Sequence, residues 1–147
     1  MKRGFTLVEL AVTLMVLVLA SFLIAPSVGR GLDGLRARAD VSGFSRYLRA
    51  AREQAVTRGQ PQQVRLEDDG RTLAMLSGDP ATARSSRHFA FLLGIEPEPP
   101  SARTVTFQPQ GLSSGGAFYL LAPGNRRYLV TVDPVTGRVT TKILTAS

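Results

Sequence analysis

The 147-residue chain contains no cysteine and a single histidine, His88. Without cysteine there is no disulfide framework and no thiolate metal site. One histidine is fewer than a histidine metal site or a serine or cysteine triad usually draws on, and no glycine-rich phosphate-binding loop is visible. The sequence therefore predicts no catalytic site, no metal site and no cofactor, and it favours a packing or surface role for His88.

Acidic residues are the scarcer charged class, with 11 Asp and Glu against 18 Lys and Arg, a formal net charge of +7. The acids are interspersed among the bases, which favours an ordinary solvated surface, while affinity for nucleic acid is the sharper alternative. Once a short amino-terminal apolar segment is set aside, about 120 residues remain, near the common size of one domain.

Charge is also missing from residues 10–25, a run of 16. Together with residues 5–9 the run reaches 21, enough to cross about 30 Å of hydrocarbon once at about 1.5 Å per residue. Because Lys2 and Arg3 precede it, the positive-inside rule predicts a cytoplasmic amino terminus and a domain beyond the inner membrane. Glu9 is costly in lipid and should favour association with a positive group at the same depth.

A cleavable secretory signal peptide is the alternative for this segment. It should end in a small-residue cleavage site directly behind the apolar run, where this chain has Pro26, Arg30 and Asp33. The nominal motif Ala37–Ala39 lies more than ten residues farther on, inside a helical pattern. We therefore expect the apolar segment to stay with the protein.

The first ten residues carry a specific resemblance. Lys2–Gly4 followed by Phe5–Leu10 resembles the class III leader of type IV pilins and of the pseudopilins of type II secretion. The resemblance implies that a prepilin peptidase cuts between Gly4 and Phe5 and methylates the new amino group of Phe5. Glu9 would become the fifth residue of the mature chain, where the family's glutamate is thought to meet the amino-terminal charge of a neighbouring subunit.

An amphipathic pattern predicts a second helical half after Pro26. Its apolar stripe begins at Leu32 and Leu35 and continues at helical spacing through Val41, Phe44, Leu48, Ala51 and Ala55. Pro26 should kink the helix, and three nearby glycines should make the region around it a flexible joint.

Arginines on this helix lie away from the apolar stripe and predict a solvated face: Arg36, Arg38, Arg46, Arg49, Arg52 and Arg58. Gly59 and Pro61 supply a permissive cap residue and then a residue that cannot continue a helix. The helix should therefore end near Arg58.

Beyond the helix, alternating and β-branched runs between turn signals predict antiparallel strands at 63–67, 72–77, 104–107, 117–122, 127–132 and 138–144. The turns between them are expected at Asp68–Gly70, Pro123–Asn125 and Asp133–Gly137. In the middle of the chain, residues 78–87 are expected to be mobile and His88–Leu93 can form a short strand. The prolines of 96–103 rule out a central strand there.

Two further pairs of segments narrow the resemblance to one branch of this family. Phe107–Gly111 with Ser113–Gly116, and Ala51–Ala55 with Arg58–Pro61, are similar to the GspH and FimT branch of the family. The branch implies an α+β, type IV pilin-like fold in which a long kinked helix packs on antiparallel sheet. The corresponding division of the chain is a leader at 1–4, a transmembrane half-helix at 5–25, a joint and amphipathic half-helix at 26–58, and an antiparallel β domain at 59–147.

The branch also implies a structural function rather than an enzymatic one. The H pseudopilin is a minor subunit near the tip of the periplasmic filament of type II secretion, whereas FimT-like and FimU-like minor pilins prime or cap type IV pili. The expected partners are prepilin peptidase, other pseudopilins or pilins through the amino-terminal helix, the inner membrane, and secreted cargo or DNA. The secretion pseudopilin is our first hypothesis and the minor pilin is the alternative. A membrane-anchored enzyme would need a constellation of polar residues that this sequence lacks.

The alternative includes a DNA-binding role. Some FimT-like pilins resemble DNA receptors for transformation and carry a late Gly-Arg-x-Arg pattern, whereas Gly137–Thr140 has threonine in place of the second arginine. The candidate phosphate contacts are Arg126, Arg127, Arg138 and Lys142. The competing interpretation is that Arg138 only follows a turn glycine and faces solvent at a strand end.

Overall fold

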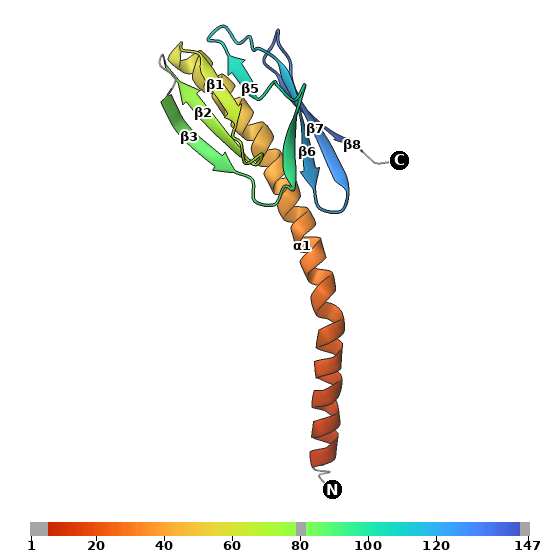
Figure 1. Cartoon of the computed structure of the whole chain (residues 1–147). Coiled ribbons are helices and arrows are strands. Elements are labelled where there is room, and N and C mark those ends of the chain that lie inside the picture. The colour runs from red at the N-terminus through yellow and green to blue at the C-terminus, as the bar shows by residue number, and fades with distance from the viewer. Residues whose placement is uncertain (1–5, 79–81, 145–147) are drawn as a thin grey trace.

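The computed structural model describes residues 6–78 and 82–144, and within the long helix it omits the side chains of residues 23–31. Gly4 and Phe5, the expected cleavage site, lie outside the described residues. One helix, α1, runs from Leu7 to Arg58. Figure 1 shows its first half projecting away from a domain that is built around its second half.

Both ends of α1 follow from local chemistry. Thr6 has an extended backbone, and its hydroxyl accepts a hydrogen bond from the backbone N–H of Glu9 at 3.3 Å, which satisfies one donor of the first turn. At the other end Gly59 is left-handed, with a φ of 62°, and the helix ends at Arg58. The backbone of α1 is helical throughout, including at Pro26. The side chain of Pro26 is not among the described side chains, and the predicted kink at this residue stays a prediction.

Two four-stranded antiparallel sheets follow in the described part of the chain. The first has the order β3-β2-β1-β5 and consists of β1 (Gln62–Leu66), β2 (Thr72–Ser77), β3 (Thr82–His88) and β5 (Thr104–Phe107). The second has the order β4-β6-β7-β8 and consists of β4 (Gly94–Glu98), β6 (Gly116–Ala122), β7 (Arg126–Val132) and β8 (Val139–Leu144). The second half of α1 contacts strands of both sheets, which ties them into one domain.

The core forms where α1 meets the two sheets. Phe44 is fully buried, and its ring centroid lies 5.6 Å from that of Phe89, just after β3, and 5.5 Å from that of Phe118 in β6. One helical side chain therefore joins the helix to both halves of the domain. Pairs of aromatic rings at this spacing add stabilisation beyond their buried area.

The predicted apolar stripe of the helix is confirmed in its later part, where these residues are buried: Val41, Phe44, Leu48, Ala51 and Ala55. Its predicted first residues are wrong, because Leu32 and Leu35 are 44% and 62% exposed. The stripe begins in fact at Ala37, the first buried position among the described side chains of α1, since the domain does not extend over Leu32 and Leu35.

The structure corrects the prediction for the middle of the chain. Thr82–His88 forms β3 although the sequence predicts a mobile segment, and the residues after His88 form a turn and not a short strand. All residues of β3 are exposed, so it forms because β2 offers an open edge and because the Tyr47 hydroxyl donates to the Ser85 carbonyl oxygen at 2.9 Å. The proline-bearing strand β4 lies at a sheet edge, where proline is tolerated.

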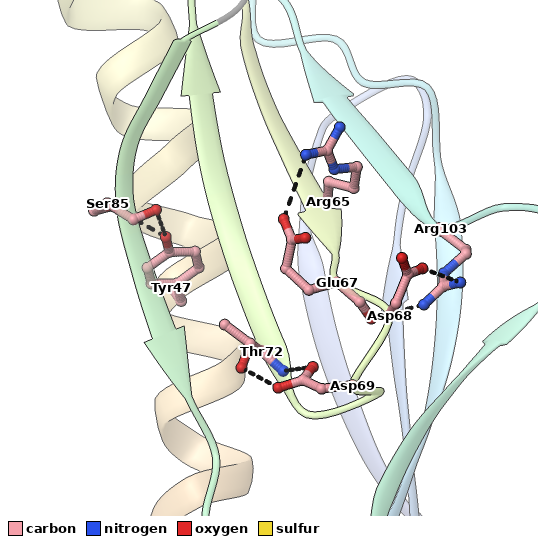
Figure 2. A network of polar contacts seen from close by, with 8 residues as sticks. All are labelled: Tyr47, Arg65, Glu67, Asp68, Asp69, Thr72, Ser85 and Arg103. Atoms are coloured by element: carbon pink, nitrogen blue, oxygen red, sulfur yellow. Dashed lines mark hydrogen bonds and ion pairs between the residues drawn. The ribbon is translucent and has the colours of Figure 1, made fainter.

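The β1–β2 turn is held by the carboxylate of Asp69, as Figure 2 shows. One oxygen accepts hydrogen bonds from the backbone N–H groups of Arg71 and Thr72, both at 2.9 Å, and the other accepts one from the Thr72 hydroxyl at 2.5 Å. These bonds lower the pKa of Asp69 to about 2, and the bond from the Thr72 hydroxyl contributes most to the shift. His88, the exposed last residue of β3, lies 2.9 Å from the same hydroxyl through Nδ1, so the lone histidine contacts this surface turn.

Candidate functional site

The first half of α1 presents an apolar surface that the domain leaves uncovered. Its large apolar side chains between Leu7 and Phe22 are 54–86% exposed. Glu9 is exposed on the same half, and among the described residues no basic side chain lies within 4.0 Å of its carboxylate. No helix within the described residues is long and apolar enough to cross a membrane. The predicted span at 5–25 includes positions outside that description.

A groove of about 1410 Å³ lies between the last turns of α1 and the β7–β8 hairpin. It is at the end of the domain far from the amino terminus, where α1 ends and β7 turns into β8 (Figure 1). The loop after β5 closes it through Pro109–Gly111. The charged residues that line the groove are Arg49, Arg52, Glu53, Asp133 and Arg138.

Two helical arginines bind the backbone of the hairpin. Arg49 donates from Nη2 to the carbonyl oxygen of Val139 at 3.2 Å, and Arg52 donates from Nε to the carbonyl oxygen of Thr136 at 3.1 Å. The sequence predicts a solvated face for both arginines, and this is confirmed for Arg49, which is exposed, whereas Arg52 is half-buried where the hairpin approaches it. Arg52 belongs to the motif segment 51–55, which the structure brings together with segment 107–111 at this groove.

Gly137 explains why a glycine precedes Arg138 in the hairpin. Its φ is +62°, a conformation that side chains disfavour. A Cβ built there would lie 2.6 Å from the carbonyl oxygen of Gly111 and 2.9 Å from Nε of Arg52. The glycine therefore permits both the tight turn and the close approach of the two loops to the helix.

Asp133 fixes the same turn from its first residue. Its Oδ1 accepts hydrogen bonds from the backbone N–H groups of Val135 at 2.9 Å and Thr136 at 2.8 Å, and from the Thr136 hydroxyl at 3.0 Å. The bonds from Thr136 are the main cause of a lowered pKa for Asp133. The hairpin is thus held in one conformation where it borders the groove.

Replacing Gly137 by alanine is expected to destabilise the domain by about 2–4 kcal/mol, the sum of a left-handed penalty and a forced displacement of packed atoms. Gly59 is the matched control, since its φ is also 62° but a Cβ there meets nothing within 4 Å. Gly59→Ala should cost only the conformational part. Urea unfolding of the full chain in mild detergent measures both, and equal losses for the two variants would refute the close packing at Gly137.

The structure places Arg126 and Arg127 on opposite faces of the second sheet, because neighbours along a strand alternate. The Arg126 guanidinium lies against α1, with Nη1 3.2 Å from the point where Gly34 would carry a Cβ. Arg127 faces outward, with Nη2 3.5 Å from Oε2 of Glu96 and its guanidinium 5.3 Å from the ring centroid of Tyr119. The sequence pair is therefore not one phosphate-binding unit in space.

Lys142 and Arg138 lie at different places along β8. Lys142 pairs with Leu129 and so shares the outer face with Arg127, two residues from Leu129 in β7. Arg138 lines the groove at the opposite end of the hairpin, about 13 Å from Lys142 along an extended strand. Of the four predicted DNA contacts, only Arg127 and Lys142 are thus brought onto a common face.

Solved structures share this architecture. The type IV minor pilin FimU of Pseudomonas aeruginosa matches with a TM-score of 0.59 at 16% identity, over 71% of this chain and 91% of that chain. The minor pseudopilin EpsH of the type 2 secretion system of Vibrio cholerae matches with a TM-score of 0.60 at 18% identity, over 74% and 97%. The helix packed on antiparallel sheets is therefore the type IV pilin-like fold, as predicted.

Sequence comparison gives the family within this fold. The family model described as Type II transport protein GspH matches residues 40–137. The type II secretion system protein H of Xanthomonas campestris pv. campestris is 26% identical over 138 residues, which cover 93% of this chain and 81% of that protein. The chain belongs to the GspH family and is a GspH-like minor pseudopilin, in agreement with the first hypothesis.

Proposed function

We propose that this minor pseudopilin is a structural subunit near the tip of the periplasmic pseudopilus of a type II secretion system. The first half of α1 holds it in the inner membrane before assembly, with the amino terminus in the cytoplasm and the domain in the periplasm. The observation that carries the proposal is the exposed apolar surface between Leu7 and Phe22. So large an apolar surface is unfavourable in water and calls for lipid or neighbouring helices to cover it.

During assembly, the contacts of this apolar surface with lipid would be replaced by contacts with the helices of other pseudopilins. Glu9 lies in the apolar half of α1 and favours a positive partner at the same depth. After cleavage behind Gly4, the methylated amino group of Phe5 on another subunit would supply that charge. The partners are thus prepilin peptidase and other pseudopilins, with secreted cargo at the surface of the domain. The role is structural, and the energy for filament growth comes from elsewhere in the secretion machine.

Gly4→Ala tests the leader. The substitution is expected to block leader removal, because the peptidase that acts on such leaders cuts after the glycine, and the protein should keep its first four residues. Intact-mass spectrometry of the membrane-extracted protein, coexpressed with prepilin peptidase, measures this and also reports methylation of Phe5. Ser21→Ala is the control and should be processed like the unchanged chain. Normally trimmed Gly4→Ala protein would sink the leader assignment.

A minor pilin of a type IV pilus is the second candidate, because FimU matches the fold about as well as EpsH does, with TM-scores of 0.59 and 0.60. Its DNA-binding form would contact phosphates through Arg126, Arg127, Arg138 and Lys142. These side chains point to different faces and lie at opposite ends of the second sheet, which favours the structural role. A deletion strain that loses secretion but keeps its pili would support the pseudopilus, and the reverse would support the pilus.

A further inference from the structure

The groove between the end of α1 and the β7–β8 hairpin is lined by more basic than acidic side chains. Among the described residues, no carboxylate lies within 4.0 Å of the guanidinium nitrogens of Arg49, Arg52 or Arg138. Glu53 and Asp133 also line the groove, so its formal charges are three positive and two negative. Asp133 has one oxygen committed to the hairpin turn.

Acidic residues at the β1–β2 turn are, in contrast, paired within the chain. Figure 2 shows Asp68 with Arg103 and Glu67 with Arg65, at nitrogen–oxygen distances of 3.0 Å and 3.4 Å. The adjacent Asp69 is held by Thr72. This exposed acidic turn is therefore compensated locally, which makes it a poor partner for the groove of a second copy.

Two of the groove arginines are fixed before any partner arrives. Arg49 and Arg52 each use a guanidinium donor on a hairpin carbonyl, which leaves further N–H donors on each planar fork. A side chain that is already held loses less rotamer freedom on binding. Such a fork also matches a carboxylate with two parallel hydrogen bonds. The guanidinium groups of Arg49 and Arg52 are thus held in positions from which their remaining N–H groups can bind carboxylates.

An apolar wall stands beside these charges. Val56 lines the groove from α1 and is 50% exposed, and Pro109 and Pro134 line it from the two loops. A groove of about 1410 Å³ with this lining accommodates a stretch of chain in which acidic and apolar side chains alternate. It is larger than a single carboxylate requires.

We propose that this groove binds an extended acidic segment of a neighbouring pseudopilin. The groove lies at the end of the domain away from the first half of α1 (Figure 1), so in a filament anchored by those helices the partner is the subunit on the tip side. Duplex DNA fits less well, because Arg127 and Lys142 lie outside the groove and the basic side chains therefore form no continuous track for a phosphate backbone. The inference rests on the proposed function for the source of the partner, but not for the chemistry of binding.

The test uses the full chain in mild detergent and the peptide acetyl-(Asp-Val)₃-amide carrying an uncharged dye, with acetyl-(Asn-Val)₃-amide as the isosteric neutral control. Fluorescence anisotropy should give about tenfold tighter binding of the aspartate peptide, the usual scale for a charged hydrogen-bonded contact. Arg138→Gln should remove about tenfold of that affinity, whereas Arg127→Gln, an equal charge change outside the groove, should leave it unchanged. Glu53→Gln keeps every arginine and should tighten binding about twofold by removing a like charge.

Several outcomes would overturn the inference. Equal binding of the two peptides would exclude carboxylate recognition, and equal losses in Arg138→Gln and Arg127→Gln would reduce it to general charge attraction. Binding of a 20-base-pair duplex that competes with the peptide and depends on Arg138 would assign the groove to nucleic acid. Self-association lost in Arg138→Gln would assign it to a second copy. A failure of the proposed function would appear separately, as normal secretion by a Glu9→Ala strain with peptide binding intact.

Discussion

Glu9→Ala is expected to leave the protein in the membrane fraction and to impair its incorporation into the pseudopilus. Placing alanine in hydrocarbon costs less free energy than placing glutamate there, so membrane insertion should be unchanged or improved. Incorporation should fall by about tenfold or more, because the positive group of the neighbouring subunit would be left without its partner in a desolvated setting. The carboxylate therefore matters to the assembled state and not to the stored monomer.

The measurement combines membrane fractionation with crosslinking to other pseudopilins, in a strain whose secretion of a marker enzyme is followed in the medium. Glu9→Gln is the matched control, since it keeps the shape and removes the charge, and it should fail as alanine does. Ser21→Ala lies on the same half of the helix and should assemble normally. Unimpaired crosslinking of Glu9→Ala would remove the reason for a carboxylate at this position.

The elements that could be predicted from sequence are those with a local period. The buried part of the helical stripe, from Val41 to Ala55, repeats at helical spacing, and strands such as β6 and β7 combine β-branched or apolar residues with flanking turn signals. Such patterns need only one buried face to be visible. The extent of the stripe was harder to predict, because the sequence does not tell how far along the helix the sheets reach. Leu32 and Leu35 lie on the part of the helix that the sheets do not cover.

The features that escaped prediction depend on distant partners. β3 has no apolar alternation, and the open edge of β2 together with the Tyr47 hydroxyl imposes its conformation. Arg49 and Arg52 donate to backbone groups 90 and 84 residues away, so nothing near them in sequence predicts these hydrogen bonds. The candidate site on the hairpin was visible only as the glycine and arginine that close its turn.

Strand geometry also separates residues that the sequence joins. Arg126 and Arg127 are adjacent and read as one basic unit, yet in a strand adjacent side chains leave opposite faces. One consequently lies against Gly34 of the helix and the other beside Glu96 and Tyr119. Once residues 126–132 are assigned to a strand, its period of two predicts that these two side chains lie on opposite faces of the sheet.

Phe44→Ala should be the most destabilising single substitution considered, with an expected loss of about 3–5 kcal/mol in the free energy of unfolding. Phe44 is fully buried and its ring packs against Phe89 and Phe118, so truncation would leave a cavity at the point where the helix meets both halves of the domain. A domain of this size has about 5–15 kcal/mol in total, so the expected loss is a large share of its stability.

Leu35→Ala is the matched control for this loss. Leu35 lies on the same helix and in the stripe that the sequence predicts, but it is 62% exposed in the structure, so its truncation should cost less than about 0.5 kcal/mol. Urea unfolding in mild detergent can be followed by tyrosine fluorescence, because the chain has no tryptophan and its three tyrosines, 47, 119 and 128, belong to the domain. A comparable loss in both variants would mean that the domain covers the helix farther toward its amino terminus than the structure has it, and a small loss in Phe44→Ala would remove that ring from the centre of the core.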